Sequence, residues 1–339
     1  MIASDPQQAG GSRYVLVVLV HGFLGWGDDV KRPGMRRSYF NGVKEFYEKE
    51  YQKAEAPWVL RVVAPTLPAC ESVRNRAAIL QSEIGKIVGA LPAKSGVHIV
   101  AHSQGGLDAR WMIAQGEMVP HIASLTTIAT PNGGTILADL AYRCRHVILL
   151  LAKAAVYAWN AMERALRNTA DDSPSNRYPW EFLRRLLEGM DVPLPVFVRS
   201  VHDLTQNGAH ALRDALAERE GKLPKNGAAT CYFSYAGDMD QPTRHPFQNL
   251  LLKPASLILK WKSRRRGEPS INDGAVSLAS SRFPWRQEIE GEKIIPFNHF
   301  LQLNWRFPDF RRNPDMDDNL RAIYRDIMND ILRTEGLLE

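Results

Sequence analysis

The chain has few cysteines, no long hydrophobic run and no large excess of either charge. Its 339 residues include three cysteines, Cys70, Cys144 and Cys231, whose spacing matches no metal-binding pair, which argues against a disulfide framework or a cysteine-held metal. No segment reaches the roughly 18–20 consecutive apolar residues that a transmembrane helix needs. The net charge of +6 is too small to indicate nucleic-acid binding. These absences favour a globular protein with reduced thiols and no membrane-spanning helix.

The N-terminal residues MIASDPQQAGGSR are polar and do not resemble a secretory signal. We therefore expect a cytoplasmic protein, or a secreted one if a leader peptide has been removed. The chain also contains no internal repeat or low-complexity tract, so a repeat array is not expected.

Apolar strand patterns alternate with helical patterns in the first third of the chain. The strand patterns cover 14–20, 58–65, 97–101 and 122–130. The helical patterns between them cover 38–52, 71–91 and 105–115. Nearly continuous apolar strands separated by helices predict a parallel sheet that is covered on both faces.

The alternation stops after residue 135. Residues 136–228 are mostly helical in pattern, including 147–159 and 178–190, and strand patterns return at 230–237 and 293–297 before a last helix at 316–333. A sheet interrupted by a helical insertion predicts a core that carries a cap. We expect one domain over 1–339, with its core at 14–135 and 229–335 and a helical cap or lid at 136–228.

The stretch AHSQGG places Ser103 between the strand at 97–101 and the helix at 105–115. A serine is a poor nucleophile unless a base takes its proton, and a sharp strand–turn–helix exposes it to a substrate. Such a turn needs small residues two positions before and after the serine, and Ala101 and Gly105 meet this requirement. The pattern predicts a nucleophile elbow.

The segment HGFLGWG, just after the first strand, is the predicted companion of the elbow. An oxyanion hole needs two N–H donors, which we expect from the backbone of Gln104, after the nucleophile, and of Phe23. Gly22 lets the backbone approach closely. His21 is expected to support this loop rather than act as the catalytic base.

HGFLGWG, AHSQGG and TTIATPNGGT (126–135) together resemble the bacterial true lipases of the α/β-hydrolase fold. The resemblance is good over 14–135, poor over the cap, and resumes from about residue 230. It implies an α/β-hydrolase with a mostly parallel central sheet, flanking helices and a helical lid, and a triad in the order Ser, acid, His. Asn132 departs from the family, in which the Thr-Pro motif continues with His.

The expected partners of Ser103 follow in that order. SINDGAVSLASSRFP (270–284) is similar to the family's catalytic-acid segment and points to Asp273, with Asp238 and Asp240 as alternatives. PFNHFLQLN is similar to the family's Asn-His-Leu segment and points to His299. The predicted chemistry is acyl transfer through Ser103, with His299 as the base and Asp273 holding its tautomer.

No cofactor and no metal are expected. Relatives often carry Ca²⁺ near the catalytic His, held by an Asp two residues beyond it, but here Leu301 and then Gln302 follow. The insertion at 28–50 also lacks the His and Asp cluster that some relatives use for Zn²⁺.

The predicted function is that of a carboxylic-ester hydrolase, a lipase or esterase, acting on acyl esters of medium to long chain. An acyltransferase and a polyester depolymerase use the same triad and remain alternatives, as does a non-catalytic lipid-surface protein. The apolar stretch at 147–159 indicates either a buried core helix or a lid that meets lipid. The segment 250–266 joins apolar residues to a cationic end, as peripheral lipid anchors do. Ester or lipid substrates are therefore the expected partners, with no nucleic acid, and the oligomeric state is left open.

Overall fold

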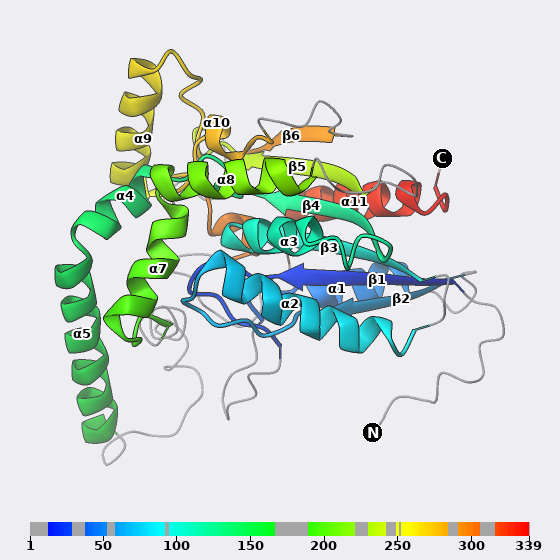
Figure 1. The fold of residues 1–339 in the computed structure, drawn as a ribbon, viewed down its shortest axis with the longest axis horizontal. Coiled ribbons are helices and arrows are strands. Elements are labelled where there is room, and N and C mark those ends of the chain that lie inside the picture. Colours follow the sequence, from blue (N-terminus) through cyan, green and yellow to red (C-terminus); the bar gives the residue numbers. More distant parts are fainter. Residues whose placement is uncertain are drawn as a thin grey trace.

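The computed structural model describes residues 13–28, 38–52, 58–91, 95–166, 189–220, 230–241, 249–250, 252–283, 291–305 and 316–338. Six strands form one sheet in the order β2-β1-β3-β4-β5-β6, and every neighbouring pair runs parallel (Figure 1). They are β1 (Arg13–Val20), β2 (Trp58–Val63), β3 (Gly96–His102), β4 (Ile122–Ile128), β5 (Cys231–Gly237) and β6 (Gly291–Ile295). The parallel sheet with flanking helices confirms the predicted fold class.

Alternate residues of β1 serve two separate hydrophobic cores, because successive side chains of a strand point to opposite faces. Its buried residues 15, 17 and 19 pack with α1 (Val43–Tyr51) and α11 (Asp318–Thr334). Residues 16, 18 and 20 pack with α2 (Val73–Val88) and α3 (Gln104–Ala114). Both faces of the sheet are therefore covered, which explains why the strands are apolar throughout.

The strand order changes direction at β1, since β2 pairs with one edge of β1 and β3 with the other. The carboxyl ends of β1 and β3 thus lie at the topological switch point, where open α/β sheets bind their ligands. The two motifs singled out in the sequence, HGFLGWG and AHSQGG, follow these two strands.

Helices fill the described part of the segment between β4 and β5. They are α4 (Ile136–Arg143), α5 (Arg145–Leu166), α7 (Leu194–Leu204) and α8 (Gln206–Glu220). The predicted helix at 178–190 lies outside the described residues except for its last two. In Figure 1, α4, α5 and α7 stand at the end of the sheet to which the strands point, with α9 (Lys253–Arg265) beside them.

The α5 helix buries only a narrow face over its first four turns. Leu149 and Ala152 are buried, whereas Leu150 is 69% exposed and Leu151 is 63% exposed. The interpretation of this stretch as a buried core helix is therefore wrong, because a core helix would cover its apolar residues on all sides. No helix within the described ranges is long and apolar enough to cross a membrane.

The first helix begins later than its pattern predicts, at Val43 instead of residue 38. Gly42 has a φ of 84°, in the left-handed region, so the chain turns there before the helix starts. Tyr39 and Phe40 are instead buried in the core next to the sheet. This turn brings the Tyr39 hydroxyl to His102, at the carboxyl end of β3.

Candidate active site

Ser103 occupies a sharp turn between β3 and α3 with a φ of 54° and a ψ of −128°. Its backbone N–H donates to Ile128 O at 2.9 Å, which ties the turn to the end of β4. The following glycines have no room for a side chain. A Cβ on Gly105 would lie 2.6 Å from Val20 O, and one on Gly106 would lie 2.0 Å from the Thr130 hydroxyl. The elbow pattern predicted a small residue at position 105. The requirement for a glycine at position 106 follows only from its contact with Thr130.

The loop after β1 lies directly against this turn. A Cβ on Gly22 would come 2.8 Å from Ser103 Cβ, so only a glycine allows the two segments to approach this closely. The N–H groups of Leu24 and Gly25 are used within the fold, donating to Ala69 O and Gly22 O. Among the described residues, the N–H groups of Phe23 and Gln104 have no such partner. They are therefore available to an oxygen placed at Ser103.

His21 holds the loop in this shape. Its Nδ1 lies 2.9 Å from Gly22 O, and its Nε2 accepts a hydrogen bond from the Leu67 N–H at 3.0 Å. Burial, and then the Arg76 charge, lowers the pKa of His21 to about 3. The ring is thus neutral, with its proton on Nδ1 for donation to Gly22 O. Both ring nitrogens are occupied in holding two loops together, which matches the supporting role expected for this residue.

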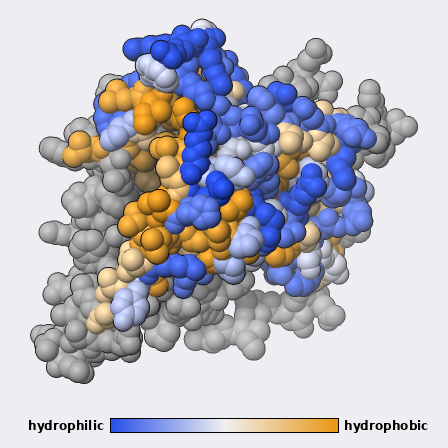
Figure 2. All heavy atoms as spheres, turned by 60° about the vertical axis from the view of Figure 1, so that its left-hand side comes forward, coloured by the Kyte–Doolittle hydropathy of each residue, from blue (hydrophilic) through white to orange (hydrophobic). Residues whose placement is uncertain are grey.

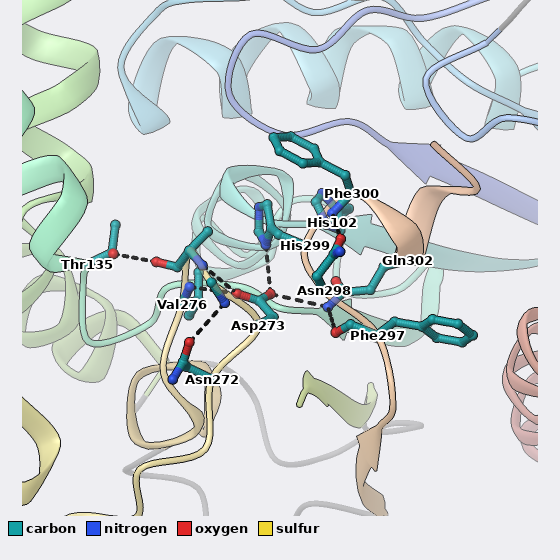
Figure 3. A network of polar contacts seen from close by, with 12 residues as sticks. His102, Thr135, Asn272, Asp273, Val276, Phe297, Asn298, His299, Phe300 and Gln302 are labelled. Carbon is teal, nitrogen blue, oxygen red and sulfur yellow. Dashed lines mark hydrogen bonds and ion pairs between the residues drawn. The ribbon is translucent and has the colours of Figure 1, made fainter. Parts of the chain in front are cut away.

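Asp273 and His299 form a hydrogen-bonded pair on loops at the same edge of the sheet (Figure 3). His299 Nδ1 lies 2.7 Å from Asp273 Oδ2, and the His299 backbone N–H donates to Asp273 O at 3.0 Å. The other carboxylate oxygen, Oδ1, accepts from the backbone N–H groups of Ala275 at 2.9 Å and Val276 at 2.7 Å. Asp273 is fully buried, so these donors replace the water that its charge would otherwise need.

The alternative acids have other partners. Asp240 forms ion pairs with Lys253, at 3.6 Å, and with Lys260. Asp238 accepts a hydrogen bond from the Asp240 backbone N–H at 3.0 Å. Of the three candidate acids, Asp273 is the one that contacts His299.

His102 and His299 bring the serine turn and the Asp–His pair together. Their ring centroids are 4.4 Å apart, and His102 immediately precedes Ser103. The Ser103 hydroxyl itself makes no hydrogen bond to a described residue. A loose contact between nucleophile and base is common in an enzyme without substrate, and it tightens when the substrate binds.

Two further side chains support this arrangement. The Tyr39 hydroxyl lies 2.9 Å from His102 Nδ1, and the Gln302 amide donates to Asp273 Oδ2 at 3.2 Å. Burial, and then the His299 charge, lowers the pKa of His102 well below its usual range, so His102 is neutral beside His299. No sequence motif marks Tyr39 or Gln302, because each acts through a partner far away in the chain.

A buried ion pair lies beneath both loops. Arg76 Nε contacts Asp108 Oδ2 at 2.8 Å, and Arg76 also donates to His21 O at 2.7 Å and to Pro68 O. Burial, opposed by Arg76, raises the pKa of Asp108 to about 7. No sequence pattern named above predicted this pair. The sequence feature that could have revealed it is a charged residue on the buried face of the α2 helix, where Arg76 lies among Val73, Ala77 and Leu80.

Asn132, the residue that departs from the lipase pattern, is buried and hydrogen-bonds two segments of the fold. Its Oδ1 accepts from Arg110 Nη1 at 2.9 Å, and its Nδ2 donates to Ser281 O at 3.0 Å. Asn132 therefore links α3 to α10 (Leu278–Ser281), the short helix that follows the Asp273 loop.

The described residues contain no group of three or more His, Cys, Asp or Glu side chains that could hold a metal ion. Near His299, Leu301 is buried and the Gln302 amide donates to Asp273. In the insertion at 28–50, residues 29–37 lie outside the described ranges. The expectation that the protein needs no metal stays a prediction.

A serine on a strained strand–turn–helix at the switch point of a parallel sheet is the arrangement of the α/β hydrolases. The chain belongs to the alpha/beta hydrolase family, whose model matches residues 17–265.

Named relatives are lipases. A triacylglycerol lipase 2 from Saccharomyces cerevisiae is 33% identical over 105 residues, covering 30% of each chain. A lipase from Staphylococcus epidermidis is 24% identical over 95% of this chain and 54% of its own length. The chain thus spans about half or less of these curated relatives.

Solved structures of similar fold include Staphylococcus hyicus lipase, with 16% identity, a TM-score of 0.59 and 99% coverage of both chains. Lipase 1 from Pelosinus fermentans has 17% identity and a TM-score of 0.57, with 92% of this chain and 98% of that chain covered. These findings confirm the resemblance to bacterial lipases that the motifs indicated.

Proposed function

We propose that this protein is a carboxylic-ester hydrolase in which Ser103 is the nucleophile, His299 the base and Asp273 the acid. The observation that carries the proposal is the convergence of a strained, partly exposed serine with a hydrogen-bonded pair of His299 and the buried Asp273 at one edge of the sheet. A serine held only for structural reasons would need neither the strain nor the adjacent pair.

In the proposed reaction, His299 Nε2 takes the proton of the Ser103 hydroxyl as its oxygen attacks the ester carbonyl. Asp273, through its 2.7 Å contact with Nδ1, keeps the imidazole in the required tautomer and stabilises its positive charge. The N–H groups of Phe23 and Gln104 stabilise the oxyanion. His299 then protonates the departing alcohol, and a water activated by the same base releases the acid from the serine.

Acyl esters of medium to long chain are the proposed substrates. The named lipase relatives support this choice, and so does the apolar surface on the helices beside the carboxyl edge. In this proposal the helical insertion at 136–228 is a cap on a single domain, and the enzyme meets its substrate at a lipid interface. We expect activity to rise as a substrate passes its solubility limit, and we expect a preference for longer chains in a p-nitrophenyl ester series. Simple saturation and a preference for acetate would contradict this part of the proposal.

Substitution of the nucleophile and the base tests the proposal directly. Ser103→Ala and His299→Ala are each expected to reduce kcat on a p-nitrophenyl ester by roughly 10³–10⁶, because the members of a triad act as a unit. Circular dichroism checks that each variant is folded. Ser256→Ala, at a buried serine on α9, and His121→Ala, at an exposed histidine, are the matched controls and are expected to keep full activity. Near-normal turnover by Ser103→Ala would disprove the proposal.

A further inference from the structure

Exposed hydrophobic side chains are concentrated at one end of the molecule. Twelve large hydrophobic residues in the described ranges are exposed, and nine of them fall within 140–157 or 250–261. The nine are Leu140, Val147, Leu150, Leu151, Tyr157, Leu250, Leu257, Ile258 and Trp261. Isolated exposed apolar residues are normal, but a concentration of this kind marks an interaction surface.

Positive charge is concentrated in the same place. Residues 136–158 and 252–268 together contain nine Lys and Arg but only two Asp and Glu, and Asp240 pairs with Lys253 and Lys260, which leaves a local excess of six. The whole chain has an excess of six, so the remainder of the protein is nearly neutral. The two segments are adjacent, since Lys262 of α9 lies 3.9 Å from Asp139 of α4. We call α4, residues 145–158 of α5, and α9 the cap-end surface.

The α9 helix shows how the two properties combine. It buries Ser256, Leu259 and Ser263 against the protein and presents Trp261, 54% exposed, on its outer side. The guanidinium of Arg265 stacks on the Trp261 ring at 4.1 Å from its centroid. A surface pocket of about 380 Å³ lies on α9 and is lined by Leu257, Lys260, Trp261, Arg264 and Arg265. Neither Arg264 nor Arg265 forms an ion pair with a described carboxylate, so both charges are open to a partner.

We propose that the cap-end surface docks on bilayers that contain anionic phospholipid. Apolar side chains of α5 and α9 enter the boundary between headgroups and acyl chains, while Arg264 and Arg265 bind lipid phosphates. Charge complementarity selects this partner, because an apolar surface alone would not need the local excess of six positive charges. The surface stands at the end of the sheet to which the strands point, so docking turns the Ser103 edge toward the lipid (Figure 1). Figure 2 shows hydrophobic patches bordered by hydrophilic residues at this end.

The test measures co-sedimentation of the full chain carrying Ser103→Ala, which leaves the lipid intact, so the result does not depend on the proposed hydrolase activity. Vesicles of phosphatidylcholine, with and without phosphatidylglycerol, are the probe. Phosphatidylglycerol is expected to increase binding, and high salt is expected to remove the increase. Arg264→Gln with Arg265→Gln should lower partitioning about 25-fold, since each basic residue near an anionic surface contributes about fivefold. Trp261→Ser should lower it about tenfold.

The matched control is Lys49→Gln with Lys86→Gln, which removes two exposed charges from α1 and α2 and should leave binding unchanged. Equal loss in the control, or equal binding to both kinds of vesicle, would overturn the proposal. Tighter binding to duplex DNA than to vesicles would overturn it too, as would a vesicle-free dimer that Trp261→Ser dissociates. In the otherwise unaltered chain, the Arg264 and Arg265 substitutions should leave hydrolysis of a water-soluble ester unchanged, which separates failure of docking from failure of the proposed activity.

Discussion

At the scale of single residues, the candidate site combines a strained serine with a fully satisfied carboxylate. A non-glycine residue at the φ of 54° found for Ser103 costs about 1–3 kcal/mol, so the surrounding structure must hold it there. The contacts at Gly22, Gly105 and Gly106 show how: a side chain at any of these positions would collide with a neighbouring segment. Asp273, by contrast, receives hydrogen bonds on both oxygens and is held in one orientation.

Asp273→Asn is expected to lower kcat by on the order of 10⁴ while the fold is kept, because the amide reverses the hydrogen bond that sets the tautomer of His299. Asp240→Asn is the matched control. It removes ion pairs with Lys253 and Lys260 at a partly exposed site, so its kcat should stay near that of the unaltered protein. Ester hydrolysis under saturating substrate gives both values. The opposite ranking of the two variants would assign the acid to Asp240.

At the scale of helices and loops, the buried Arg76–Asp108 pair holds four segments together. Arg76 belongs to α2 and Asp108 to α3, and the same guanidinium bonds to carbonyl oxygens in the loops after β1 and β2. The loop after β1 carries Phe23, and α3 begins at Gln104. The pair therefore fixes the separation of the two proposed oxyanion donors without touching the substrate.

Arg76→Leu is expected to lower the free energy of unfolding by about 3–5 kcal/mol, because it leaves Asp108 buried without its partner. The result should lie toward the lower limit, since Asp108 already has a pKa of about 7 and becomes neutral easily. The double variant Arg76→Leu with Asp108→Leu should recover part of the loss, which urea unfolding measures. If the loss of the double variant equals the sum of the losses of Arg76→Leu and Asp108→Leu measured singly, the two residues are not coupled.

At the scale of the whole molecule, the carboxyl edge of the sheet holds a set of buried, neutral histidines. His21 and His102 both have a pKa below the ordinary range, chiefly because they are buried. The unfolded chain takes up a proton on His21 near pH 6.5, whereas the folded chain does so only near pH 3. The contribution of His21 to the stability of the folded state is therefore lost as the pH falls through this window.

We expect protonation of His21 in the unfolded chain to lower the free energy of unfolding progressively from about pH 7 to pH 3, by a total on the order of 4 kcal/mol. Asp108, whose pKa is raised to about 7, acts in the opposite direction over this range, so the His21 contribution is measured as the difference between the unaltered protein and a His21 variant. His21→Gln should remove this contribution, so lowering the pH from 7 should reduce the stability of the variant less than that of the unaltered protein, although the variant is less stable at neutral pH. His121→Gln, at an exposed position, should keep the original slope. Parallel curves of stability against pH for the unaltered protein and His21→Gln would contradict the burial argument.

The sequence by itself determined the features that depend on neighbouring residues. Strand and helix alternation predicted the parallel sheet, and AHSQGG predicted the elbow, because backbone conformation follows from residues a few positions apart. The long apolar run in α5 was recognised as well, but periodicity does not distinguish a buried helix from one that is exposed on an outer face. Exposure depends on what packs against the helix.

Only the tertiary structure decided the contacts between residues far apart in the chain. Asp273 rather than Asp238 or Asp240 lies against His299, Gln302 shares the same carboxylate, and Arg76 meets Asp108 beneath the loops. The apolar and basic side chains of α4, α5 and α9 likewise form one surface only because these helices pack near one another in the folded chain. The physical reason is that a carboxylate or a guanidinium selects its partner by distance and burial, and these are set when distant segments pack together.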